Sequence, residues 1–268
     1  MSNSNSTLIL GKENPYPEEK LDWALMAMMV PHSAIRLGMH RLEKGIDGLI
    51  SDPNLKNCKL MRDWYNNHFY QFVHHHHDIE EKILFPWVDK YTKERSQNTK
   101  SIPPAIGAEH KDLTEMLEKF KTDFGKLVEI MESGKDGKAY VTYEQDGKNL
   151  LNNEIKPLCT KFVALTSGHL DGEELNVVAL IREYFTPEEE SKQMTKIIQS
   201  LGLGGAKLML PWIYEGMGIF DPTPEKKFQK MYNSTIPVPL RVFLGCCWTG
   251  SYKRNNKGVI DGLGALGK

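Results

Sequence analysis

The feature that most constrains this chain is a set of four long stretches in which apolar residues return every three or four positions. Each stretch also carries one histidine on its apolar stripe: His32 in 22–50, His76 in 58–92, His110 in 104–133 and His169 in 147–185. This period places the apolar side chains on one face of an α-helix, and no stretch alternates as a strand would. The sequence therefore predicts an all-α fold based on an antiparallel four-helix bundle.

The rest of the chain suggests three parts. Residues 1–20 are polar and lack periodicity, which predicts a mobile N-terminal arm. Residues 21–185 would form the bundle. A new helix should begin at Thr186, because a capping threonine is followed by proline and then by acidic residues. Residues 186–268 are therefore expected to form a helical C-terminal extension that packs on the bundle.

Composition argues against several classes of partner and against secretion. The 34 basic and 35 acidic residues give a net charge of -1, so neither nucleic acid nor an acidic membrane is an expected partner. The longest apolar run, WALMAMMV, is too short to cross a bilayer, and the polar N-terminus does not resemble a secretory signal. Four cysteines without a CxxC pair are typical of free thiols, so we expect a cytoplasmic protein.

Motifs for nucleotide binding and for hydrolysis are missing from the sequence. It contains no glycine-rich phosphate loop, no Rossmann fingerprint and no GxSxG motif. Nucleotide-dependent and hydrolase functions therefore have no support.

Two of the four histidines are followed, four residues later, by a glutamate: His76 by Glu80 and His169 by Glu173. Residues i and i+4 of a helix project from consecutive turns on one side, so each pair points to a common place. A single inward histidine is satisfied by one hydrogen bond, but several buried ionisable groups cost several kcal/mol unless they share a cation. Imidazole nitrogen and carboxylate oxygen together suit iron or manganese better than a structural zinc.

The segments PHSAIRLGMHRLE around His32, HHDIEEKILFP at 76–86, EHKDLTEML around His110 and HLDGEE at 169–174 resemble the four signatures of the hemerythrin (HHE cation-binding) family. The resemblance covers residues of about 25–185. It implies an antiparallel bundle that holds two non-haem iron ions, with manganese as the alternative. A bridging oxo, hydroxo or water ligand would join the ions, together with the two glutamates of the HxxxE pairs.

The resemblance also implies a set of ligands. The residues that match family ligands are His32, His76, Glu80, His110, His169 and Glu173. His77 either reaches the second ion or faces the flank of the bundle, because it lies about 100° from His76 around the helix. Glu81, Glu109 and Glu174 are the expected outer or alternative ligands.

One departure from the family pattern affects the expected chemistry. Oxygen carriers of the family have two histidines at HxxxH spacing on the third helix, whereas Ile106 and Thr114 occupy the positions four residues from His110. A missing ligand leaves a coordination position open or filled by water, since each iron ion takes roughly six donors. This argues against simple reversible oxygen carriage.

These observations lead to one principal expectation and two alternatives. The principal expectation is a binuclear iron protein that binds and activates dioxygen. The first alternative is an oxidoreductase, a di-iron oxidase or oxygenase that acts on a small organic substrate beneath the C-terminal extension. The second is a non-catalytic sensor or store of iron, oxygen or nitric oxide.

The C-terminal extension offers a way to separate these alternatives. Its aromatic residues Trp212, Tyr214, Phe220 and Trp248 either roof a small-molecule pocket or pack as ordinary core. An apolar passage from the metal-facing residues to the surface beneath residues 203–250 would favour the enzyme.

Overall fold

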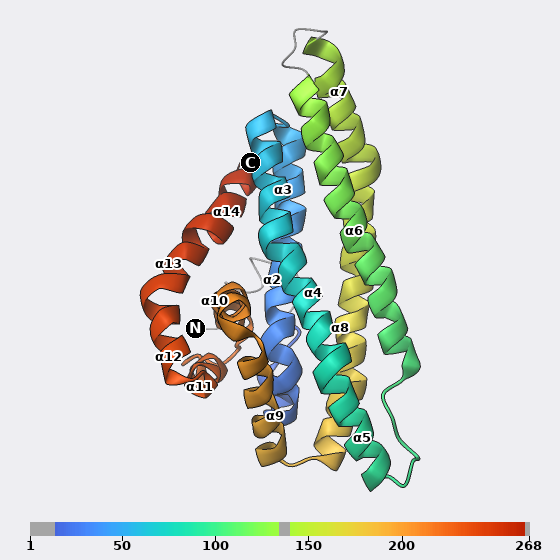
Figure 1. Cartoon of the computed structure of the whole chain (residues 1–268), viewed down its shortest axis with the longest axis vertical. Helices are drawn as coiled ribbons and strands as arrows, with labels where there is room; N and C mark the ends of the chain where they lie inside the picture. The colour runs from blue at the N-terminus through green and yellow to red at the C-terminus, as the bar shows by residue number, and fades with distance from the viewer. Residues whose placement is uncertain (1–13, 134–139, 266–268) are drawn as a thin grey trace. The chain divides into compact units, whose positions relative to one another are not determined.

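The computed structural model describes residues 14–133 and 140–265, and all regular secondary structure within them is helical (Figure 1). The predicted all-α class, a helical bundle with additional C-terminal helices, is confirmed. The first and third predicted helices correspond to α2 (Trp23–Ser51) and α6 (Pro104–Ser133). None of the described helices carries an apolar stretch long enough to cross a lipid bilayer.

The second and fourth predicted helices are each interrupted by turns of π-helix. The second consists of α3 (Leu55–Trp64), η2 (Tyr65–Phe69), α4 (Tyr70–Ile79), η3 (Glu80–Leu84) and α5 (Phe85–Arg95). The fourth consists of α7 (Tyr140–Leu150), η5 (Leu151–Ile155) and α8 (Lys156–Tyr184). Turns of this kind occur often at functional sites, and η3 begins at Glu80.

Two of these π turns, η3 and η5, each come just before a proline. Before Pro86, the N–H of Phe85 donates to the carbonyl of Glu80, five residues earlier, and the helix then continues into α5. Before Pro157, the N–H of Lys156 donates to Leu151 in the same way. A wider turn accommodates a proline because proline has no N–H to donate and its ring crowds the preceding turn.

The C-terminal extension is a succession of helices. The predicted start of the first is confirmed, because Thr186 and Glu189 form a capping box in which each side chain accepts a hydrogen bond from the other residue's backbone N–H. The elements are α9 (Pro187–Ser200), α10 (Gly202–Phe220), α11 (Lys227–Thr235), α12 (Val238–Phe243), η6 (Leu244–Trp248), α13 (Thr249–Tyr252), η7 (Lys253–Lys257) and α14 (Gly258–Gly264).

The chain forms two compact units, and each takes a segment from all four long helices. The first unit contains the residues up to Leu37, Phe72–Glu109 and Gly168–Gly250. The second contains Gly38–Gln71, His110–Ser167 and the residues from Ser251 onward. The predicted limits of the bundle and the extension, 21–185 and 186–268, are a different division and stay a prediction.

An aromatic cluster forms the core of the second unit. The ring of Tyr65 lies 5.2 Å from that of Phe124, and Phe120 meets Phe162 edge to face at 5.7 Å. Such pairs add specific ring contacts to the burial of large apolar surfaces. The Tyr65 hydroxyl is not left unsatisfied, since it donates to the carbonyl of Leu117 across 2.8 Å.

In the first unit, α10 packs directly against α2. A Cβ atom added to Gly216 would lie 2.8 Å from the backbone nitrogen of Ala34, so only glycine permits this approach. The backbone atoms at this contact belong to Ser33 and Ala34, which directly follow His32 in α2. The contact therefore joins the C-terminal helices of this unit to the segment of α2 that carries the site.

The sequence prediction of a mobile arm over residues 1–20 does not hold for Tyr16. Residues 1–13 lie outside the described part of the chain, but the Tyr16 side chain is fully buried and its ring meets Phe220 edge to face at 6.1 Å. The neighbouring Asn14 donates to the carbonyl of Phe220 across 2.8 Å. Hydrogen bonds and an aromatic contact thus hold this segment in place. The local sequence pattern does not predict these contacts.

Candidate metal centre

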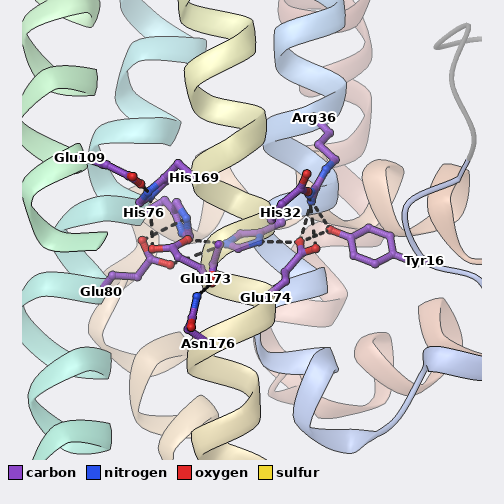
Figure 2. Close-up of polar contacts among 12 residues, drawn as sticks. Tyr16, His32, Arg36, His76, Glu80, Glu109, His169, Glu173, Glu174 and Asn176 are labelled. Atoms are coloured by element: carbon purple, nitrogen blue, oxygen red, sulfur yellow. Dashed lines mark hydrogen bonds and ion pairs between the residues drawn. The ribbon is translucent and has the colours of Figure 1, made fainter. Parts of the chain in front are cut away.

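Four buried side chains of the first unit converge on one place (Figure 2). They are His32 on α2, His76 on α4, Glu80 at the start of η3 and Glu173 on α8. Each offers one ligand atom, and these atoms all lie within 4.8 Å of one another. The exposed fraction of every one of these residues is 3% or less, so the cluster is removed from bulk water.

Glu173 lies between two histidines and directs one oxygen to each. Its Oε2 atom is 3.2 Å from Nε2 of His32, and its Oε1 atom is 3.2 Å from Nε2 of His169. Glu80 repeats part of this pattern, with Oε2 at 3.2 Å from Nε2 of His76 and Oε1 at 3.8 Å from Nε2 of His32. The carboxylates therefore occupy the centre of the site and the imidazoles surround them.

Two further carboxylates fix the orientation of the imidazoles. Glu174 accepts a hydrogen bond from Nδ1 of His32 at 2.8 Å, and Glu109 accepts one from Nδ1 of His169 at 2.9 Å. A carboxylate at Nδ1 holds the proton there and leaves the Nε2 lone pair available. In both histidines Nε2 is the atom that faces Glu173, so the ring orientation suits a metal ligand.

Glu174 is held in turn by Arg36 and Tyr16, which Figure 2 shows on the side of His32 away from Glu80. Arg36 Nη1 and the Tyr16 hydroxyl each donate to Oε1 of Glu174 at 2.7 Å, and they also contact each other. Burial opposes ionisation of Glu174, but His32 and Arg36 outweigh it and lower its pKa to about 2. Glu174 is therefore a carboxylate at neutral pH.

The cluster favours positive charge at its centre. Burial disfavours a charged His32, yet contacts with Glu173, Glu174 and Glu80 outweigh it and raise the pKa of this histidine well above its ordinary value. Nε2 of His32 is buried and makes no hydrogen bond within the described residues. The negative charge of the same carboxylates would stabilise a cation bound among these groups. Imidazole with carboxylate is a donor set that iron and manganese accept.

His77 belongs to the inner side of the site. It is buried, its ring stands perpendicular to that of His169 at 5.8 Å, and the two residues have ring nitrogens within 4.8 Å of each other. The role of His77 as a ligand of a second ion stays a prediction. Glu81, one residue past Glu80, is exposed and is not part of the cluster.

His110 is buried on α6, in the second compact unit. Its assignment as a ligand stays a prediction from the sequence. The remaining histidines of the HHHH run face outward, since His75 is exposed and His74 lies 3.7 Å from Asp78 at the surface.

An apolar cavity of about 360 Å³ adjoins the cluster within the first unit. His76 and Glu80 form part of its wall, together with further residues of α2, α4, η3, α9, α10 and α11. The residues that α10 contributes are Met209, Leu210 and Ile213. This volume lies within the range of about 300–1,000 Å³ that is usual for small-molecule sites.

The four aromatic residues that the sequence offered as a roof do not line this cavity. Trp212 packs against Phe72 at 5.2 Å, and Phe220 contacts Tyr16 as described above. Trp248 stacks on Phe243 at 5.5 Å, and Tyr214 is partly exposed. Aliphatic and methionine side chains such as Met209, Leu210 and Ile213 form most of the wall instead, and the aromatic residues that line it are Trp23 and Tyr232.

Sequence comparison identifies the part of the chain that carries these residues. The family model described as "Hemerythrin HHE cation binding domain" matches residues 25–181. Among curated proteins, the chain is similar to "Zinc finger protein BRUTUS-like At1g18910" of Arabidopsis thaliana, with 26% identity over 186 residues. That match covers 69% of this chain but only 14% of the relative's length. No solved structure matches the chain significantly.

Proposed function

The chain belongs to the hemerythrin HHE cation-binding family, and we propose that it holds a pair of non-haem iron ions that bind and activate dioxygen. The observation that carries this proposal is the position of Glu173, whose two oxygens each lie 3.2 Å from a different imidazole. A carboxylate that serves two histidines in this way is suited to span two ions. A single-ion site would need only one of its oxygens.

In this proposal the ligands divide into two groups around Glu173. His32, His76 and Glu80 would hold one ion, and His169 and His77 would hold the other. His110 joins the second group on the basis of the sequence pattern alone. Manganese is the alternative metal, and an oxo, hydroxo or water bridge would complete the centre.

When bound, ferrous ions supply the electrons and the open coordination positions with which dioxygen reacts. The protein's own groups prepare the site. Glu174 and Glu109 keep the proton on Nδ1 of His32 and His169, so Nε2 remains a donor to the metal. Arg36 keeps Glu174 ionised, and the burial of the cluster excludes bulk water.

The cavity beside His76 and Glu80 favours the oxidase or oxygenase alternative over a sealed store or sensor. An apolar space that ends at two proposed ligands offers room for a small organic substrate next to the metal. A sensor or store of iron, oxygen or nitric oxide needs no such space. The catalytic reading is therefore the second function that a specific observation supports.

The test follows the optical spectrum and oxygen uptake of the reduced, iron-loaded protein. On exposure to air we expect a near-ultraviolet charge-transfer band in the wild type and in Glu188→Ala, which removes an exposed carboxylate outside the site. Glu173→Ala should show no such band. Absence of the band in wild-type protein that contains iron would contradict the proposal.

Oxygen consumption separates the two readings of the same centre. Continuous uptake in the presence of excess reductant is expected of an oxidase or oxygenase. Uptake that stops at stoichiometric oxygen and reverses on degassing would instead indicate a carrier or sensor.

A further inference from the structure

The cavity beside the metal cluster contains one acidic group that the proposed metal site does not use. Glu190 lies on α9, lines the cavity and is only 9% exposed. Its carboxyl makes no hydrogen bond or ion pair among the described residues. A largely buried carboxylate without a partner is unfavourable, because the part of its hydration that is lost is not replaced.

The other residues that line the cavity indicate which charge a ligand beside Glu190 would carry. Most of them are aliphatic or methionine side chains such as Met26, Ile79, Met194 and Ile213, and no lysine or arginine is present among the described lining residues. A ligand with a negative group would meet Glu190 and Glu80, and among the described lining residues only His76 could carry a positive charge to receive it. A ligand with a positive group would instead supply the counter-ion that Glu190 lacks.

The cavity is also accessible and of suitable size. Met231, which is 41% exposed, lines it from α11, so the space reaches the protein surface. An aliphatic amine with nine non-hydrogen atoms occupies about 270 Å³, if each atom takes about the 30 Å³ of a water molecule. This is smaller than the cavity, whose volume is about 360 Å³.

We propose that the cavity binds a small aliphatic amine, whose hydrocarbon chain packs on the apolar walls and whose ammonium group pairs with Glu190. The amine lies beside His76 and Glu80, so it occupies the position of a substrate for the proposed metal centre. That role rests on the proposed function, whereas the binding itself does not. Burial raises the pKa of Glu190 to about 7, and an ammonium partner would favour its ionised form.

The test measures the binding of n-octylamine by calorimetry at pH 8, with n-octanol and octanoate as probes of the same length. We expect the wild-type protein to prefer n-octylamine over n-octanol. In Glu190→Gln the affinity for n-octylamine should fall about tenfold or more, while n-octanol binds as before or more tightly. Glu188→Gln removes an exposed charge from the same helix and should bind both probes as the wild type does.

A second variant tests whether binding occurs in the cavity. Met194→Trp places a large ring in the space and should weaken n-octylamine and n-octanol together, with circular dichroism confirming that the fold is intact. Equal affinity of wild type and Glu190→Gln for n-octylamine would overturn the proposal, as would a preference for octanoate. Metal content is measured on the same samples. A protein that contains no metal but still binds n-octylamine would refute the proposed function and leave the amine site intact.

Discussion

His32 donates its Nδ1 proton to Glu174 across 2.8 Å, so Glu174 decides which ring nitrogen faces the cluster. Carboxylates behind ligand histidines typically change metal affinity by about 10–100-fold. We predict that Glu174→Gln weakens iron binding by a factor of this size, measured by competition with a chelator. The matched control is Asp171→Asn, because Asp171 also pairs with Arg36 but is largely exposed. Unchanged iron affinity in Glu174→Gln would show that the His32 contact does not tune the site.

Removal of the metal should destabilise the protein. Two carboxylates, Glu80 and Glu173, would be left buried among imidazoles, and a ligand that binds only the folded state adds about 4 kcal/mol at a thousandfold excess over its dissociation constant. We predict a lower Tm by scanning calorimetry after chelation, restored by added ferrous iron. Glu173→Ala should have a low Tm that neither treatment changes. Identical melting of chelated and untreated wild type would argue against a bound metal.

The stability of the protein should depend on pH through Glu190. Its pKa is about 7 in the folded protein and near 4.5 as a reference value, so the folded state binds the proton more tightly. Ionisation of Glu190 therefore lowers the free energy of unfolding. This effect is absent below pH 4.5, grows between pH 4.5 and 7, and is complete above pH 7. Glu190→Gln should therefore match the wild type near pH 4.5 and exceed its free energy of unfolding by about 1–3 kcal/mol at pH 8.

Urea denaturation across this pH range measures the effect. Other ionisable groups that share the cavity, His76, Glu80 and Tyr232, are present in both proteins, so the difference between the two curves isolates position 190. A difference that is constant from pH 4.5 to 8 would mean that Glu190 titrates as an exposed carboxyl does.

The close contact of α10 with α2 predicts a position-specific cost. Gly216→Ala would place a methyl group 2.8 Å from backbone atoms of Ser33 and Ala34, so we expect a loss of about 1–3 kcal/mol in unfolding free energy. Gly204→Ala is the control in the same helix. Nothing lies within 4 Å of its added Cβ atom, and alanine there should stabilise the helix by about 0.5–1 kcal/mol. Equal effects of the two changes would contradict the packing.

The long helices were predictable from the sequence because their apolar residues follow the helical period closely. The same period, with glutamate four residues after His76 and His169, also predicts that these pairs turn to one side. Glu80 and Glu173 of these pairs lie with His32 and His76 in one cluster of the first unit. Local spacing could not show which way His77 points. His77 lies about 100° around the helix from His76, so it belongs neither to the inward face nor to the outward face.

The partners of Glu174 could not be predicted with equal ease. Arg36 follows His32 by four residues, so its position on the same face was a usable signal. Tyr16 lies in a segment without periodicity, and only the folded chain brings it to Glu174 across 158 positions of sequence. The cavity and Glu190 depend on how α9, α10 and α11 pack against α2, which no single helix pattern specifies.

The metal content of freshly purified protein tests the central claim most directly. Mass spectrometry of iron, manganese and zinc per chain should give about two ions of iron, or of manganese, in the wild type and in Glu188→Ala. Glu173→Ala should retain much less. A wild-type protein that is natively folded, binds no added ferrous iron and contains no metal would contradict the claim that these buried carboxylates and imidazoles are gathered around cations.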